Sequence, residues 1–418
     1  MQTNHGMKKN IFTAIVLLLV YITGICQQKS LDYFIRQALT NSPLLKDYQN
    51  QVQINQADSQ RIRAIYQPQV TGNSTNSYAP VIGGYGYDGA ITNGGQLSAV
   101  VGVSQALVSR KNLSAQFETL RLQNQGITNT AKLSEQDLAR TVIAQYITAY
   151  GDMQQLSFAR EVNTLLKKEE NLLKSLTETN VYRQTDYLTF LVTRQQQELS
   201  VKQLSIQLQN DYATLNYLSG IVDTAQAVLA EPSVTLQQLP DINQSVFFRK
   251  FTIDSLQLGN SRSLVDFSYK PKINLYADAG YNSTLTYLPY KNFGTSFGVN
   301  ITVPIYDGRQ KKIQYSKISI AEKTRAVYKD FFKAQYNQQI AQLMQQLRAT
   351  GELIEEINHQ VKYAEGLINV NIKLLETGDA KIADLVIAVN NYLMAKNLLT
   401  QNNVSRLQII NQINYWNR

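Results

Sequence analysis

Two hydrophobic patterns with different periods divide this sequence. In short stretches, apolar residues alternate with polar or small ones, which is the two-residue period of a β-strand. Over most of the remaining chain, apolar residues recur every three or four positions, which is the period of an amphipathic helix. The order of the two patterns predicts a helix, a strand pair, a long helix and a further helix, and this order occurs twice.

The alternating pattern is clearest at 97–103, 273–279 and 297–305. Each stretch would place apolar residues on one face and polar or small residues on the other, with tyrosines near its ends. Membrane β-strands have this pattern, although a half-buried strand of a soluble sheet has the same period. The sequence therefore predicts two β-hairpins, at about 68–108 and 271–306. It does not decide whether their strands lie in a membrane or in a soluble sheet.

The helical pattern covers two long stretches without proline, between 81 and 231 and after 304. Because proline interrupts helices, its absence permits very long ones. In the second of these stretches, a helix that continues from about 309 to 375 would be on the order of 100 Å long. Its seam positions alternate spacings of four and three, which predicts coiled-coil packing. These positions are Tyr336, Ile340, Leu343, Leu347, Thr350, Ile354, Ile357, Val361, Ala364 and Ile368.

The first helix is expected to begin after Ser30, because serine is favoured at the position before a helix. Asn41, Ser42 and Pro43 then break the helix and restart it, since proline is favoured at the first helical position. The restarted helix is expected to end near Tyr66.

A shift of 198 residues aligns the two halves of the chain. Glu-Thr-Asn at 178–180 falls on Glu-Thr-Gly at 376–378, and Asp186 falls on Asp384. A constant shift over a long stretch indicates an internal repeat. The predicted parts are a signal peptide at 1–26, a first repeat at 27–219, a linker at 220–242 and a second repeat at 243–418.

Residues 1–28 have the features of a secretory signal. Two lysines precede an apolar run at 11–22, which is too short to span a bilayer as a helix. Cleavage before Gln27 would remove Cys26. In the alternative, a lipoprotein signal, Cys26 would be acylated and retained, but the bulky Ile25 before it argues against this. Either signal takes the protein out of the cytoplasm.

The composition removes most kinds of catalytic and metal chemistry. The 418 residues include two histidines, His5 and His359, and one cysteine, Cys26. These three residues cannot form a zinc site, a cysteine–histidine pair or a disulfide framework. His359 lies off the helical seam, so we expect it on the surface. We expect no enzyme activity, no cofactor and no metal site.

The net charge of +9 is spread thinly over the chain. Only 17% of the residues are charged, and no run of Lys or Arg exceeds two. A nucleic-acid-binding protein would concentrate basic residues on one face or arm. We therefore expect no nucleic-acid partner.

The number of strands favours an oligomer. Each chain offers four candidate strands, and no segment beyond the signal has 18 consecutive apolar residues. Four strands cannot close a membrane sheet, and lipid tolerates no open sheet edge. Two copies would give eight strands, and three copies would give twelve with room for a channel. The trimer is the better interpretation.

Several short motifs occur at the ends of the predicted elements. They are Ser-Leu-Asp at 30–32 before Ala38, Leu39, Asn41 and Pro43; Pro-Gln-Val at 68–70; Val-Pro-Ile-Tyr-Asp-Gly at 303–308; and Glu-Thr-Gly at 376–378 before Asp384 and Leu385. Together they resemble the TolC type of outer-membrane efflux proteins over nearly the whole mature chain. The resemblance implies a mostly α fold of long antiparallel coiled-coil helices with two β-hairpins per chain. Three copies would form a 12-stranded outer-membrane β-barrel on an α-helical periplasmic barrel.

The resemblance also implies a function and partners. The protein would be the passive exit duct of a tripartite efflux or type I secretion system. It would lie in the outer membrane of a Gram-negative bacterium, in contact with lipid, and extend into the periplasm. Its partners would be two further copies of itself, a periplasmic adaptor and an inner-membrane pump of the RND or ABC type.

By the same resemblance, the narrowest part of the duct would carry Asp384. Asp186, the equivalent residue in the first repeat, is a weaker candidate. The family's second acidic position holds Ile387 here, so a trimer would have one ring of carboxylates. Such a ring would attract cations. In the alternative, Asp384 is a helix-start residue favoured by the helix dipole.

Two further groups of positions follow from the resemblance. Residues at the helix turns would contact the adaptor, and a second group would connect strand to helix. The turn residues are Thr179, Asn180, Arg183, Thr377, Gly378 and Lys381, and the connecting residues are Pro304, Asp307 and Gly308. The first repeat lacks the Pro and Asp-Gly of this connection.

Two other functions compete with the exit duct. One is a structural or adhesive outer-membrane protein whose helices bridge the periplasm. A protein that conducts no solute would, however, need no ring of charged residues. The other is a soluble secreted coiled-coil protein, against which the strand pattern and the Gly-rich loops argue.

Overall fold

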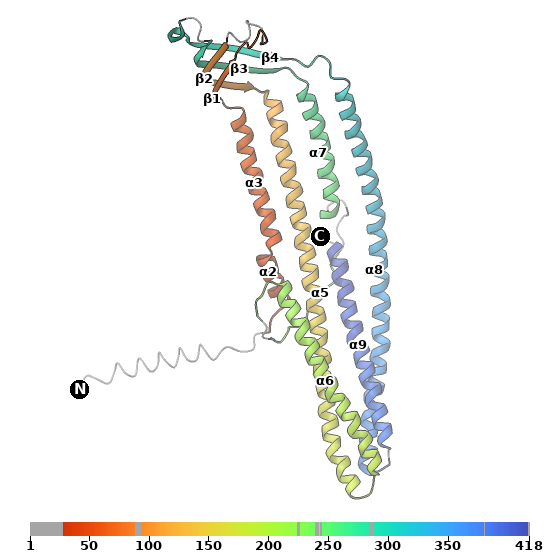
Figure 1. Ribbon diagram of the computed structural model, residues 1–418. Helices are drawn as coiled ribbons and strands as arrows, with labels where there is room; N and C mark the ends of the chain where they lie inside the picture. The colour runs from red at the N-terminus through yellow and green to blue at the C-terminus, as the bar shows by residue number, and fades with distance from the viewer. Residues whose placement is uncertain are drawn as a thin grey trace, which may run out of the picture. The chain divides into compact units, whose positions relative to one another are not determined.

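The computed structural model (Figure 1) describes residues 28–87, 94–223, 226–238, 242, 245–284, 288–379 and 381–416. The predicted signal peptide, with Cys26, lies outside these residues. The helices are α2 (Leu31–Asn41), α3 (Pro43–Ile65), α5 (Arg110–Glu178), α6 (Gln184–Leu218), α7 (Val246–Ser268), α8 (Gln310–Thr377) and α9 (Ile382–Trp416). The strands are β1 (Gln69–Ala79), β2 (Gly94–Leu107), β3 (Lys272–Ser283) and β4 (Phe293–Thr302).

The predicted fold class is confirmed: long helices alternate with two β-hairpins. α8 is one continuous helix of 68 residues, as the absence of proline predicted. α2 begins after Ser30, but the Ser30 hydroxyl makes no capping hydrogen bond. The expectation about Ser30 is therefore right in position and wrong in mechanism. At the restart, the Ser42 hydroxyl accepts a hydrogen bond from the Leu45 amide at 3.4 Å.

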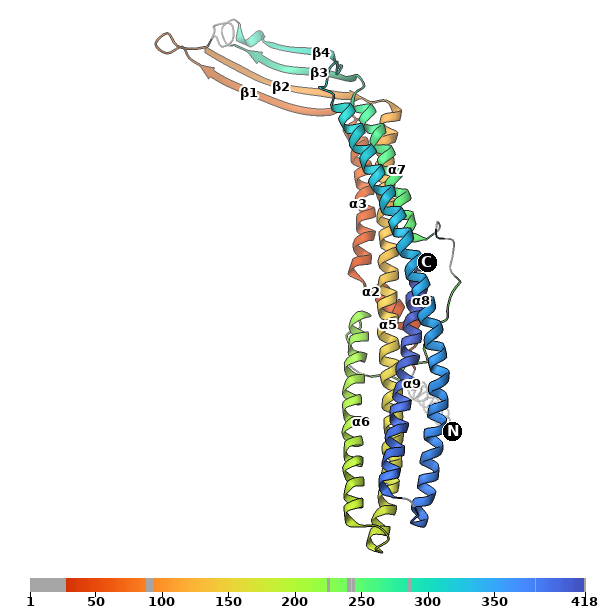
Figure 2. The ribbon, with the colours of Figure 1, turned by 90° about the vertical axis from the view of Figure 1, so that its right-hand side faces the viewer.

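The four strands form one antiparallel sheet in the order β1-β2-β3-β4 (Figure 2). Directly opposed residues point to the same face, so the register assigns every position to one of two faces. Val103 pairs with Ala277, which pairs with Phe297, and Leu275 pairs with Val299. On the opposite face Gly102 pairs with Asp278, which pairs with Ser296. One face of the sheet is therefore largely apolar and the other largely polar.

The chain forms two compact units. Unit 1 comprises residues up to 45 together with 133–245 and 334–418, and unit 2 comprises 46–132 and 246–333. The long helices α5 and α8 contribute residues to both units. Each unit takes segments from both predicted repeats, because contacts across the bundle join segments that are distant in sequence. The repeat boundaries stay a prediction.

One hydrophobic core of unit 1 is built around three aromatic rings from three helices. The ring of Phe34 on α2 lies 5.7 Å from Tyr146 on α5 and 6.2 Å from Tyr212 on α6. The Tyr146 hydroxyl lies 2.6 Å from the carbonyl oxygen of Ala230 and 3.0 Å from that of Lys29. Burial of each ring contributes about 2–3 kcal/mol. This core holds the start of α2 and the segment around residue 229 against α5 and α6.

A second core of unit 1 lies around the turns that join α5 to α6 and α8 to α9. The predicted α8 seam is buried at Ile354, Ile357, Val361, Ala364 and Ile368, and Ile368 belongs to the core at the turns. His359 is exposed, as its position off the seam predicted. The cluster at the turns contains Val162, Leu166, Leu173, Phe190, Ile368, Leu375, Ile382, Leu385, Ala388 and Val389.

In unit 2, polar side chains and phenylalanines join the helices that lead from the sheet. The Asn260 amide on α7 donates to the carbonyl oxygen of Ala115 at 3.0 Å and to the Thr119 hydroxyl at 2.8 Å. Phe248 packs on Phe332 with ring centroids 5.3 Å apart. Within the described ranges, no helix has a segment long and apolar enough to cross a bilayer.

Candidate functional site

The two helix turns of unit 1 have the same backbone geometry at equivalent repeat positions. After α5, Asn180 has φ 61°, and after α8, Gly378 has φ 80°. In the first turn the Val181 amide donates to Leu176 at 2.9 Å, and in the second the Asp379 amide donates to the carbonyl of the residue five positions earlier, also at 2.9 Å. This is the Schellman arrangement, which favours Gly or Asn at the left-handed position. The predicted adaptor-contact residues therefore include the residues that make both turns.

Among the other predicted turn residues, the structure brings together only immediate neighbours. The Thr377 hydroxyl lies 2.8 Å from a carboxylate oxygen of Asp379. The Thr179 hydroxyl lies 3.1 Å from the carbonyl oxygen of Leu176. Arg183 and Lys381 each directly precede a helix, and both are exposed. The surface of the turns thus exposes two basic side chains, and both threonine hydroxyls make hydrogen bonds within their own turns.

Asp186 and Asp384 occupy the same position, the third residue of α6 and of α9. The Asp186 amide donates to Arg183 and the Asp384 amide donates to Lys381, each at 3.0 Å. A carboxylate in the first helical turn is favoured by the helix dipole. Asp384 is exposed and Asp186 is half-buried. Asp384 is therefore the more solvent-accessible of the two, and both carboxylates occupy a position that the helix dipole favours.

Tyr182 links the two turns and was not among the predicted residues. Its hydroxyl donates to the carbonyl oxygen of Leu375 at 3.3 Å. Burial, followed by the nearby charges of Asp379 and Asp186, raises the pKa of Tyr182. A Cβ added to Gly378 would lie 3.2 Å from a methyl carbon of Val181. The turns thus contact each other through residues that sequence periodicity does not single out.

Glu169 is a buried carboxyl group in the core near the turns, and sequence reasoning also missed it. It is only 3% exposed. Burial raises the pKa of Glu169, Lys168 lowers it, and Glu376 on α8 raises it further. A signal was present, because Val162, Leu166, Glu169 and Leu173 alternate spacings of four and three. Glu169 therefore occupies a seam position that a hydrophobic residue would normally fill.

The predicted strand-to-helix connection is held by the carboxylate of Asp307. Its two oxygens accept hydrogen bonds from the amides of Arg309 at 2.9 Å and Lys311 at 2.8 Å. The Lys311 amide is the main cause of a lowered pKa at Asp307. Gly308 has φ 61°, which glycine adopts without strain. Pro304 is exposed and precedes this turn.

The polar face of the sheet carries side chains suited to contact with water. Lys272, Asn274, Tyr276 and Asp278 follow one another on this face of β3. The Ser296 hydroxyl donates to Asp278 at 2.7 Å across the β3–β4 pair. The apolar face carries exposed Val101, Leu107, Leu275, Phe297, Val299 and Ile301.

A recess of about 800 Å³ lies in unit 2 at the base of this polar face. Its lining comes from β2, β3, β4 and the ends of α5 and α7 nearest the sheet. Lys270, Lys272, Asn274 and Asn300 line it, together with the ring of Phe267. No prediction from the sequence pointed to this recess, because its residues come from four stretches that are distant in the sequence.

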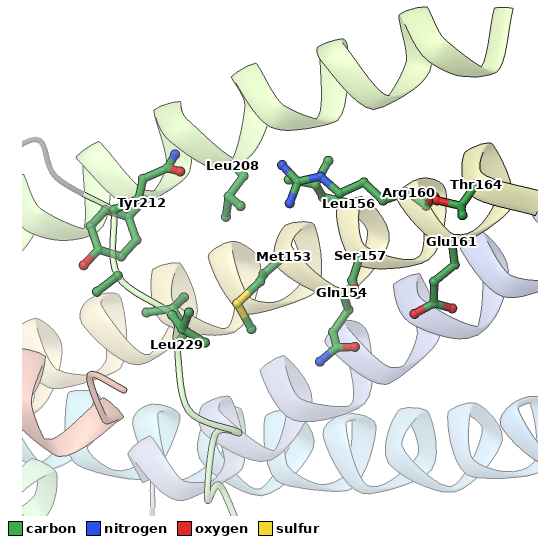
Figure 3. Close-up of a pocket in the computed structure, with 13 residues that line it drawn as sticks. Met153, Gln154, Leu156, Ser157, Arg160, Glu161, Thr164, Leu208, Tyr212 and Leu229 are labelled. Atoms are coloured by element: carbon green, nitrogen blue, oxygen red, sulfur yellow. The ribbon is translucent and has the colours of Figure 1, made fainter. Parts of the chain in front are cut away.

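A second recess, of about 850 Å³, lies in unit 1 between α5, α6 and residues 226–229 (Figure 3). Met153, Leu208 and Leu229 form its apolar part. The side chain of Arg160 extends over it toward Leu208 (Figure 3). In the described ranges no group of three or more His, Cys, Asp or Glu is arranged to hold a metal ion.

No protein-family model matches the sequence, and no curated protein matches it. Solved structures do match. CusC, a transmembrane channel, has a TM-score of 0.74 and 14% identity, over 93% of this chain and 92% of that one. The outer-membrane protein VceC of Vibrio cholerae has a TM-score of 0.72 and 13% identity, over 93% and 96%. The CmeC outer-membrane channel of Campylobacter jejuni has a TM-score of 0.72 and 12% identity, over 93% and 85%.

These matches cover nearly the whole chain, so the protein has the fold of the TolC-type outer-membrane channels. The fold that the sequence motifs implied is thereby confirmed. Of the matching proteins, CusC, OprN and CmeC are described as channels.

Proposed function

We propose that this protein is a passive exit duct across the outer membrane, the outermost part of a tripartite efflux or type I secretion system. The single observation that carries this proposal is the sheet with one apolar and one polar face, in a chain with the channel fold. The apolar face would contact lipid and the polar face would line the path of the solute. The protein would lie in the outer membrane with its helices in the periplasm.

The open edges of the sheet support a homotrimer. In the described residues, β1 and β4 each pair on one side only. Lipid does not tolerate unpaired strand edges, so β1 of one copy would pair with β4 of the next. The strands alternate in direction, and this pairing would also be antiparallel. Three copies would close a sheet of twelve strands around the duct.

Exposed apolar stripes on two helices support the same assembly. On α6 the stripe consists of Leu188, Val192, Leu199 and Ile206, spaced by four and seven residues. On α8 it consists of Tyr363, Leu367, Val370 and Leu374, spaced by four and three. Both spacings are those of a coiled-coil seam that lacks its partner. Covering each half-exposed side chain in a neighbouring copy would contribute roughly 1 kcal/mol.

The helix turns would be the docking end. The polar surface around Arg183 and Lys381 would contact a periplasmic adaptor, which would join the duct to an inner-membrane pump of the RND or ABC type. Three copies of Asp384 would form a ring of carboxylates at the mouth. Like charges held close together attract cations and would make this ring selective.

Single-channel recording of the full protein in a planar bilayer tests the function. We expect currents that prefer cations in the wild type and lose this preference in Asp384→Asn. Asp186→Asn is the comparison variant and should change the cation preference less, because Asp186 is the weaker candidate for the ring and lies on the less exposed helix start. Currents that are equal in all three proteins would retain the duct and contradict the Asp384 ring. An inserted trimer without current in any state would favour a structural or adhesive role.

A further inference from the structure

The recess at the base of the polar face has an uncompensated positive charge. Lys270 and Lys272 both line it, and its lining contains no Asp or Glu. Neither lysine has an ion-pair partner within the described part of the chain. The nearest carboxylate along α7, Asp266, is bonded to Lys311 at 3.0 Å and to the Tyr315 hydroxyl. The recess therefore presents two cations to whatever enters it.

Aromatic and amide groups complete the lining. The ammonium group of Lys270 lies 4.7 Å from the ring centroid of Phe267. The Tyr66 hydroxyl accepts a hydrogen bond from the Gln116 amide at 2.7 Å, so its own proton is free to be donated. Asn274 and Asn300 are opposed on β3 and β4. The recess combines an apolar ring, several neutral donors and two ammonium groups.

The position of the recess makes it accessible from the duct. Lys272, Asn274, Asn300 and Thr302 belong to the polar face by strand register. That face would be the solute path under the proposed function, on which this inference therefore rests. The next acidic group on this face of β3, Asp278, is six residues away from Lys272, or about 20 Å along the strand.

We propose that this recess is a binding site for amphipathic organic anions that pass along the duct. The sulfonate, carboxylate or phosphate group of the solute binds Lys270 and Lys272, and its apolar body lies against Phe267. A volume of about 800 Å³ accommodates a molecule of drug size. Three recesses in a trimer give the duct an anion-binding collar at the junction of sheet and helices.

Block of single-channel current by naphthalene-2-sulfonate tests this site in the full protein. We expect the sulfonate to block the wild type at lower concentration than the matched cation, 2-naphthylmethylammonium. In the double variant Lys270→Gln and Lys272→Gln, we expect sulfonate block to weaken roughly five- to tenfold, as for the removal of two partly exposed charges. Lys291→Gln is the control, because it removes one charge from the opposite end of the sheet.

The outcomes separate this site from the channel function. Currents with equal sulfonate block in wild type and double variant overturn the site and leave the duct intact. If the protein carries no current, equilibrium dialysis of naphthalene-2-sulfonate against the membrane-reconstituted protein measures the same site. Retention that falls in the double variant and not in Lys291→Gln supports the site, and equal retention in all three overturns it.

Discussion

The carboxyl group of Asp152 on α5 lies close to the carboxyl group of Asp211 on α6 inside unit 1, and its Oδ2 atom is buried without a hydrogen-bond partner. Asp211 accepts hydrogen bonds from the amides of Gln145, at 3.0 Å, and Gln207. Burial, followed by the neighbouring carboxyl group of Asp211, raises the pKa of Asp152 to about 7.

This pair predicts that the stability of unit 1 decreases as the pH rises from 4 to 8. An acid whose pKa is higher in the folded chain than in the unfolded chain contributes its stability at low pH and loses it as the pH passes the folded pKa. The loss should be roughly 2–4 kcal/mol. Asp152→Asn removes the titration and should raise the melting temperature at pH 8. Differential scanning calorimetry at pH 5 and pH 8 measures both effects.

Asp47→Asn on α3 is the control for this prediction, because the Asp47 side chain is exposed. It should leave the difference between the two melting temperatures unchanged. A wild-type protein that is equally stable at pH 5 and pH 8 would contradict the raised pKa of Asp152.

Glu169 should also destabilise the folded protein at neutral pH. Its pKa is raised by burial, so the charged form is disfavoured among Val162, Leu166 and Leu173. Glu169→Leu completes the apolar seam and should stabilise unit 1 by roughly 1–3 kcal/mol at pH 7.5. Thermal melts measure the change. The control is the neighbouring variant Glu170→Gln. It removes an ion pair with Arg194 at 2.8 Å and should not stabilise unit 1. A lower melting temperature in Glu169→Leu would contradict this account.

The two turns should respond in opposite ways to small substitutions. Gly378→Ala places a Cβ at φ 80° and 3.2 Å from Val181, and should cost about 1–2 kcal/mol. Asn180→Gly removes a Cβ at φ 61°, where glycine has no strain, and should stabilise the first turn by up to about 1 kcal/mol. Equilibrium unfolding by denaturant tests the pair. Equal effects of the same sign would show that the turns do not share this geometry.

Adjacent positions on β4 test the two faces of the sheet. Val299 belongs to the apolar face and Asn300 to the polar face. Val299→Arg should prevent stable insertion into lipid vesicles, because an arginine facing lipid costs about 2–4 kcal/mol near the midplane in each copy. Asn300→Arg should insert normally. Flotation of reconstituted vesicles separates inserted from free protein, and equal insertion of both variants would exclude the proposed lipid face.

The hydrophobic periods by themselves determined the elements and their faces. The α8 seam and the alternation on β2, β3 and β4 are local properties, since each follows from the repeat distance of a helix or strand. The unbroken length of α8 follows from the absence of proline for the same reason. The motifs near 303–308 and 376–378 contributed the fold class through their resemblance to the TolC type of outer-membrane proteins.

The tertiary structure decided which faces meet. The recess beside Lys272, the burial of Glu169 beside α8 and the pairing of Asp152 with Asp211 each join segments that are distant in the chain. Periodicity places a residue on a face, but it does not name the side chain across from it. That neighbour depends on the path of the chain between the two segments. For this reason the pKa of a carboxyl group such as Asp152 follows from packing and not from its place in the sequence.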